Sequence, residues 1–159
     1  YSVLSLVLKI AMNKRRTVFL FLLLSWQAMV YSKNISKWTA DTIPFELQGK
    51  FIDDYEIHYT INDSLWIQTP NVKYHIIHWD TTAKYLLARN DDKNPSENGL
   101  FTRIDYMNFS HMEPFQWGFC YTIYNAKTVE EAKIKALADR QNPRNGCNGY
   151  PFSRMKRND

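Results

Sequence analysis

Two pairs of oppositely charged residues are the side chains of this sequence that are best spaced to do chemistry together. Arg89 and Asp91 form one pair, and Arg103 and Asp105 form the other. Residues two apart on a β-strand share a face, so on neighbouring strands all four charges meet across the sheet. In a barrel mouth such groups orient a polar or anionic ligand through bidentate hydrogen bonds. The same charges can equally form a structural ion-pair network or a solvated outer face.

Aromatic side chains are a second candidate for ligand contact. An aromatic ring offers stacking area, and tyrosine and tryptophan add a polar group, so such residues inside a cavity suit a sugar or a flat apolar ligand. The alternative is that they form the hydrophobic core, as they do in many small β domains. The ligand-site candidates are Tyr74, Tyr85, Tyr106 and Trp117, with Trp79 and Tyr121 contributing to the same aromatic density.

Metal binding and nucleophilic catalysis find little support in the sequence. His75 and His78 are three residues apart, which on a regular strand places them on opposite faces, where they cannot share an ion. No Gly-x-Ser-x-Gly sequence is present. We therefore expect no metal, no cofactor and no catalytic nucleophile. The remaining enzymatic hypothesis is a hydrolase or isomerase in which Asp91 or Asp105 is the general base and Arg89 or Arg103 holds an anionic substrate.

The elements that position these residues are predicted to be short strands. From Phe45 onward the chain has runs rich in Ile, Tyr, Trp, Phe and Thr, broken by Asp, Asn, Gly and Pro at hairpin spacing. Neither face of these runs is clearly polar, which favours a small barrel or strongly curved sheet of six to eight antiparallel strands over an open sheet. The predicted strands are residues 49–53, 56–61, 65–69, 72–79, 84–90, 100–107 and 116–124.

One helix is predicted near the C-terminus. Residues 128–131 have the Thr-x-x-Glu sequence of a capping box, and Val129, Ala132, Ala136 and Leu137 follow at helical spacing. The helix is expected to end near Arg140. The turn-rich tail that follows, residues 142–152, is expected to return to the sheet.

The N-terminal region predicts export. Met12 is followed by Lys14, Arg15 and Arg16 and by the apolar run 17–24, and a small residue occurs at Ser32. This is the anatomy of a signal peptide over residues 12–32. Residues 1–11 match no part of a signal and are interpreted as translated upstream sequence, residues 33–44 as a flexible tether, and residues 45–159 as a single domain.

The charge balance argues against nucleic acid as a partner. The formal net charge of the whole chain is +4, but four of its twenty Lys and Arg residues precede residue 33. The remaining sixteen face sixteen Asp and Glu residues, so the mature chain is formally neutral. Neither nucleic acid nor an anionic membrane surface is therefore expected to be bound, and no stable membrane span is expected after cleavage.

The cysteine count is most simply explained by one disulfide. Cys120 and Cys147 are the two cysteines of the chain, and in an oxidising compartment an even pair in a small domain forms a structural bridge. A catalytic thiolate and a metal-bound thiolate are the alternatives, and both need reduced sulfur. The predicted disulfide joins the tail to the last predicted strand.

Three segments resemble a group of small secreted bacterial proteins of unknown activity. These are residues 74–76 leading into YLLARND at 85–91, GLFTRIDY at 99–106, and FCY at 119–121 with GCNGYPF at 146–152. The resemblance implies that the cysteine pair and the Arg-Asn-Asp and Arg-x-Asp segments belong to the family scaffold. A looser similarity, to lipocalin-like barrels, rests on strand number and size alone.

The sequence as a whole favours a secreted or periplasmic, non-enzymatic binding protein. Its expected partner is a small polar or aromatic-stacking ligand or an envelope protein. A structural envelope protein or an inhibitor that docks through an exposed apolar patch is a further alternative.

Overall fold

The computed structural model describes residues 41–134 and 137–158, which belong to one compact unit. The upstream segment 1–11, the signal peptide 12–32 and residues 33–40 of the tether, all expected from the sequence, lie outside the described residues.

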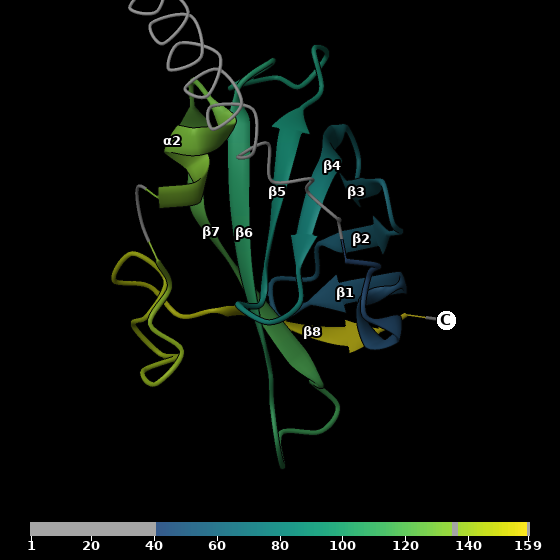
Figure 1. Cartoon of the computed structure of the whole chain (residues 1–159). Coiled ribbons are helices and arrows are strands. Elements are labelled where there is room, and N and C mark those ends of the chain that lie inside the picture. The colour runs from purple at the N-terminus through teal and green to yellow at the C-terminus, as the bar shows by residue number, and fades with distance from the viewer. Residues whose placement is uncertain (1–40, 135–136, 159) are drawn as a thin grey trace, which may run out of the picture. The chain divides into compact units, whose positions relative to one another are not determined.

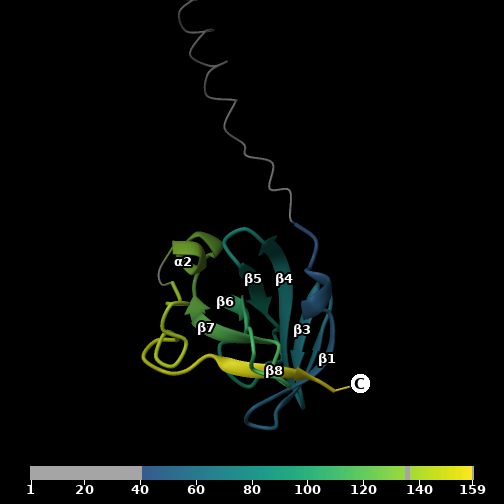
Figure 2. The same ribbon diagram turned by 90° about the horizontal axis from the view of Figure 1, so that it is seen from below.

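The domain is a closed barrel of eight strands in which each strand is antiparallel to its neighbours. The strands follow one another around the barrel in sequence order, and β8 lies between β7 and β1, as Figures 1 and 2 show. Mainly antiparallel β-structure with one short helix is therefore confirmed. The strands are β1 (Gly49–Asp53), β2 (His58–Ile61), β3 (Leu65–Gln68), β4 (Val72–Asp80), β5 (Tyr85–Asn90), β6 (Phe101–Asn108), β7 (Trp117–Ala126) and β8 (Ser153–Arg157).

Strand β8 closes the barrel and is the strand that sequence composition did not reveal. Met155 is opposite Asp53 of β1 and also opposite Trp117 of β7, so β8 hydrogen-bonds with both neighbours. Its sequence, SRMKR, carries three basic residues and one apolar one, which is weak strand composition. The single apolar residue, Met155, is fully buried.

The barrel interior is filled with side chains rather than hollow. Aromatic rings pack edge to face across it, for example Trp117 against Phe51 at 5.2 Å and Trp66 against Phe119 at 5.1 Å between ring centroids. Such T-shaped contacts add stabilisation beyond the area they bury. The buried members of this cluster are Ile43, Leu47, Phe51, Tyr59, Ile61, Trp66, Trp79, Leu86, Ala88, Ile104, Tyr106, Trp117, Phe119 and Met155.

One end of the barrel is closed by the segment that precedes β1. The 3-10 helix η1 (Phe45–Leu47) buries Leu47 completely, and Ile43 is 8% exposed. The carboxylate of Asp41 accepts hydrogen bonds from the backbone N–H and the hydroxyl of Thr81, and these bonds lower the pKa of Asp41. Asp41, the first of the described residues, therefore already contacts the barrel, inside the segment expected to be a tether.

A β-bulge in β4 overturns the expected placement of the two histidines. The register with β5 shifts between Ile76 and His78, so that Ile77 is the extra residue. His75 lies opposite Arg89 and His78 opposite Leu87, and both therefore face outward, whereas Trp79 turns into the core. The expectation of opposite faces is wrong because it assumed an unbroken two-residue period.

The helix α2 (Val129–Ile134) is shorter than predicted. Its N-terminus is capped as expected, because Thr128 Oγ1 accepts the N–H of Glu131, and the Glu131 carboxylate accepts the N–H of Lys127. Residues 135 and 136 lie outside the described residues, and from Leu137 to Arg140 the chain is not helical. Here the tail turns back along the outside of the barrel, so that Ala138 packs with Cys120 and Phe152.

The disulfide between Cys120 and Cys147 is present and holds this tail against β7. Gly146 permits the approach, because a Cβ atom there would lie 1.9 Å from the carbonyl oxygen of Asp139. The backbone N–H of Asp139 in turn donates a hydrogen bond to the carbonyl oxygen of Gly146 at 2.9 Å. A glycine is therefore required next to Cys147.

Removing the disulfide should destabilise the domain. The bridged cysteines are 27 residues apart. Opening a loop of that length raises the entropy of the unfolded chain and lowers the free energy of unfolding by about 3.5 kcal/mol. We expect the variant with both Cys120→Ala and Cys147→Ala to unfold at a lower urea concentration than the parent. Reductant should lower the parent's midpoint and leave that of the variant unchanged; equal midpoints for oxidised parent and variant would contradict a stabilising bridge.

Candidate functional site

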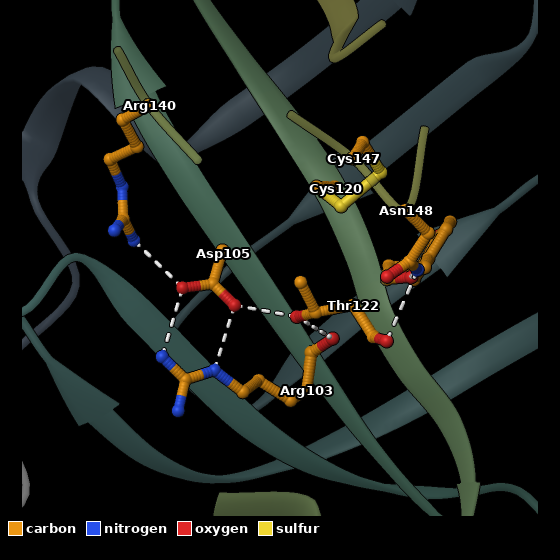
Figure 3. The surroundings of a disulfide bond; sticks show 8 residues. Arg103, Asp105, Cys120, Thr122, Arg140, Cys147 and Asn148 are labelled. Atoms are coloured by element: carbon orange, nitrogen blue, oxygen red, sulfur yellow. Dashed lines mark hydrogen bonds and ion pairs between the residues drawn. A yellow bond between two sulfur atoms is a disulfide. The ribbon is translucent and has the colours of Figure 1, made fainter. Parts of the chain in front are cut away.

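The Arg103 and Asp105 pair lies on the outer face of the barrel, beneath α2 and the tail. The Arg103 Nε and Nη2 atoms donate to the two carboxylate oxygens of Asp105 at 2.7 and 2.9 Å. Both residues are buried, Arg103 being 3% and Asp105 0% exposed. Figure 3 shows the two side chains on β6 pointing to the same side as Thr122 on β7.

Further partners complete this ion-pair network. Arg140 donates to Asp105 Oδ1 at 2.8 Å, and the Thr122 hydroxyl donates to Asp105 Oδ2 at 2.5 Å. Arg103 also donates to the backbone oxygen of Lys133 in α2, and its guanidinium lies 3.9 Å from the centre of the Tyr85 ring. The carboxylate is therefore fully occupied by protein groups, and the network fastens the helix and the tail to the barrel wall.

Arg89 and Asp91 do not join this network. Arg89 pairs with Asp92 at 2.6 Å on the surface, where Asp92 is 72% exposed. Asp91 Oδ2 lies 2.7 Å from His75 Nε2, and this hydrogen bond lowers the pKa of Asp91. The four charges expected to meet are thus divided into a buried network on the outer wall and two surface pairs near the β5–β6 loop.

Neutralising Asp105 should be far more damaging than neutralising Asp92. Asp105→Asn leaves the buried Arg103 charge without its carboxylate, a change that costs about 3 to 5 kcal/mol. Asp92→Asn removes an exposed pair worth about 1 kcal/mol or less. Urea unfolding of the two variants measures the difference; similar losses would show that the Asp105 network does not carry the expected stability.

The pairing of Asp91 with His75 is open to a separate test. Because the pKa of Asp91 is depressed in the folded state, its stabilising contribution is present above the ordinary value of 3.8 and is lost as the pH falls through the folded value. His75→Ala should move the Asp91 pKa upward, measured by carboxyl NMR titration. His111→Ala is the control and should leave the pKa of Asp91 unchanged. If the pKa of Asp91 in the His75 variant equals that in the parent protein, the pairing is excluded.

The four aromatic candidates occupy four different environments. Trp117 is buried in the central core, and Tyr85 lies under Arg103 on the outer wall. Tyr106 is in the core near the closed end, where burial raises its pKa to about 12. Tyr74 is the one of the four that lines the cavity at the opposite end of the barrel. The close packing of the others leaves no ligand space in the middle of the barrel.

That opposite end, which we call the mouth, contains a cavity of about 340 Å³. It is formed where β3, β5 and β7 end and β4 begins, together with the loop between β5 and β6. This volume is at the lower end of the range found for small-molecule sites. The lining residues are Gln68, Val72, Tyr74, Asn90, Asn94, Pro95, Ser96, Glu97, Tyr121 and Tyr124.

Buried amide side chains hold the mouth in shape. Asn90 donates to the backbone oxygens of Glu97 and Tyr124 at 2.8 and 3.0 Å, and accepts from Thr102 at 2.5 Å. Asn94 bridges both backbone groups of Lys73 at 2.9 Å. These bonds tie the β5–β6 loop to β4 and β7, so the lining is organised before any ligand arrives.

The tyrosines of the mouth are strongly desolvated. Burial raises the pKa of Tyr121 well above its ordinary value, and the neighbouring phenols of Tyr74 and Tyr59 add to the effect. Burial also raises the pKa of Tyr74. The ring centroids of Tyr74 and Tyr121 lie 5.4 Å apart, and the Tyr121 hydroxyl donates to Gln68 Oε1 at 3.2 Å. At neutral pH these tyrosines are uncharged hydrogen-bonding groups.

Sequence reasoning missed most of the mouth. Tyr121 is predicted as part of the aromatic density, but Gln68 and Glu97 carry no recognisable signal in the sequence, because an isolated amide or carboxylate in a strand or loop resembles any surface residue. The available signal was the Asn-x-x-x-Asn spacing of Asn90 and Asn94 around a turn, where Asn side chains commonly bond to backbone groups.

Comparison of the chain with protein-family models, curated protein sequences and solved structures finds no match, so the family and lipocalin-like resemblances stay predictions. None of the helices in the described part of the chain has the length and apolar character needed to cross a membrane. Within residues 41–134 and 137–158, no three His, Cys, Asp or Glu side chains are grouped as a metal site requires.

Proposed function

We propose that this protein is an exported, non-enzymatic binding protein that holds a small polar ligand in the mouth of its barrel. The observation that carries the proposal is the cavity of about 340 Å³ between Tyr74, Tyr121 and the loop residues 94–97. A concave site with apolar rings and a few convergent polar groups is the usual form of a small-molecule site.

The chemistry of the lining supports a ligand that stacks and hydrogen-bonds. Tyr74, Tyr121 and Tyr124 supply ring surface, and Gln68 and Ser96 supply amide and hydroxyl groups. Because Asn90 and Asn94 use their amides to fix the backbone, they contribute shape rather than ligand contacts. A mouth fixed in this way loses little entropy when a ligand binds, which favours affinity.

Neither carboxylate of the enzymatic alternative, Asp91 or Asp105, is placed to act as a base in the mouth. Asp105 is 0% exposed and bonded to two arginines and a threonine, so a substrate cannot reach it. Asp91 is outside the cavity lining, and its hydrogen bond to His75 lowers its pKa, which weakens it as a base. Binding without catalysis therefore has better support than hydrolysis or isomerisation.

Export is supported by the disulfide as well as by the expected signal peptide. Disulfides persist in oxidising compartments such as the periplasm and the extracellular medium. The Cys120–Cys147 bridge is a structural staple between β7 and the tail, with no thiol left for chemistry.

An interaction protein is a second candidate because of an apolar groove on the outside of the barrel. The groove has a volume of about 440 Å³ and lies between the β1–β2 turn, the β6–β7 loop and the tail. Tyr55, Met112 and Phe109 are among its lining residues, and Tyr55 is 63% exposed. Exposed apolar surface of this kind is typical of protein docking.

The binding proposal is tested by screening defined small neutral and charged polar compounds against the isotope-labelled protein by NMR. We expect bound compounds to shift the backbone N–H signals of the non-proline residues in 68–74 and 94–97. Ser96→Trp should abolish these shifts, because an indole in the mouth fills the space while Ser96 itself is exposed and makes no core contact.

Asn108→Ala is the matched control, since Asn108 lines the concavity at the closed end of the barrel. Binding should survive that change. A screen in which no compound shifts the mouth amides, or in which Ser96→Trp leaves the shifts intact, would rule out the mouth as the ligand site.

A further inference from the structure

We infer that the mouth selects an organic cation, an ammonium group carried on a small polar molecule, rather than the anion that the arginines of the sequence suggested. This inference rests on the proposed function and names the class of ligand for the same site.

The charge inventory of the mouth is negative. Among the described residues that line the cavity, Glu97 alone carries a formal charge. Its carboxylate is near enough to Tyr74 to help raise the pKa of that phenol. No hydrogen bond or ion pair within the described part of the chain occupies the Glu97 side chain, so it is available to a ligand.

No basic residue is among those that line the cavity, and three that lie near this end are directed elsewhere. Arg89 is paired with Asp92 on the outer wall. Lys73 alternates with the inward-facing Tyr74 and is therefore on the outer, exposed face of β4. Arg103 is buried beneath α2 by its bonds to Asp105. An anionic ligand in the mouth would meet a carboxylate and no basic residue in the described lining.

A second carboxylate is buried in the barrel and bonded to Tyr59. Asp53, at the end of β1, is 2% exposed and accepts hydrogen bonds from the backbone N–H groups of Tyr55 and Ile57 and from the Tyr59 hydroxyl at 3.0 Å. In the described residues it has no cationic partner. Tyr59 is opposite Gln68 of the mouth and interacts electrostatically with Tyr74 and Tyr121, so the Asp53 carboxylate adds negative potential on that side of the cavity.

The rings of the mouth suit the same ligand. A quaternary or protonated ammonium is attracted to the electron-rich faces of tyrosine rings and loses less hydration than a metal ion when it enters an apolar cavity. Tyr74 and Tyr121 are desolvated and uncharged at neutral pH, and Tyr124 stands at the rim, 49% exposed. Ring surface combined with a rim carboxylate and no basic residue is the pattern of an organic-cation site.

The test compares three probes of nearly equal shape by NMR titration of the whole protein. The probes are choline, its neutral carbon analogue 3,3-dimethylbutan-1-ol, and the anion 3,3-dimethylbutanoate. Choline should bind about fivefold more tightly than the alcohol, because the tyrosine rings and the Glu97 carboxylate both attract its charge, and the anion should bind most weakly. Glu97→Gln should reduce choline's advantage to the part that the rings supply and leave the alcohol's affinity unchanged.

Glu113→Gln is the matched control, because it removes the same charge from an exposed position in the β6–β7 loop at the closed end. It should leave all three affinities as they are. Equal binding of the three probes at the mouth would overturn the cation preference while the proposed binding function stands. The cation preference would also be overturned if the anion bound best, if Glu97→Gln left the choline affinity unchanged, or if no probe bound. In each of these cases the wider compound screen tests the binding function separately.

Discussion

The pairing of β8 with both β1 and β7 is the constraint on which the rest of the structure depends. Without it the barrel would have two open edges, and the core residue Met155 would leave the interior. Strand β8 itself has little strand propensity, so other contacts must bring it into place. The disulfide fixes the tail on β7, Gly146 allows the close approach to Asp139, and Arg140 anchors the start of the tail to Asp105 and to backbone oxygens of β6 and the β4–β5 turn.

The same requirement explains where the most conspicuous charges go. A buried carboxylate needs its charge balanced and its oxygens bonded, and Asp105 obtains both from Arg103, Arg140 and Thr122. Each partner comes from a different segment, so the network orders the helix, the tail and two strands at once. The network lies on the outer wall, away from the ligand cavity. The Arg103 and Asp105 pair, a candidate for ligand contact in the sequence, therefore stabilises the fold instead.

Aromatic residues have different roles at different positions along the barrel axis. In the middle and at the closed end they fill space, with Trp117, Trp66 and Phe119 in edge-to-face contact. At the mouth, tyrosine side chains line a cavity, and their hydroxyl groups and ring faces are available to a ligand. The amides of Asn90 and Asn94 decide this difference, because they hold the β5–β6 loop over the mouth without filling it.

The sequence by itself determined the class of fold, seven of the eight strands and the helix start, because these depend on local periodicity, turn residues and a capping sequence. It also determined the cysteine pair, because the chain has two cysteines. It did not determine β8, whose pairing is supplied by contacts far away in the chain, nor the outward turn of His78, which follows from one extra residue in β4. Nor did it separate Arg89 from Arg103 or place Tyr74 and Glu97 together. Only the closed barrel assigns an inside, an outside and a mouth, since side-chain environment depends on register and curvature that no single strand encodes.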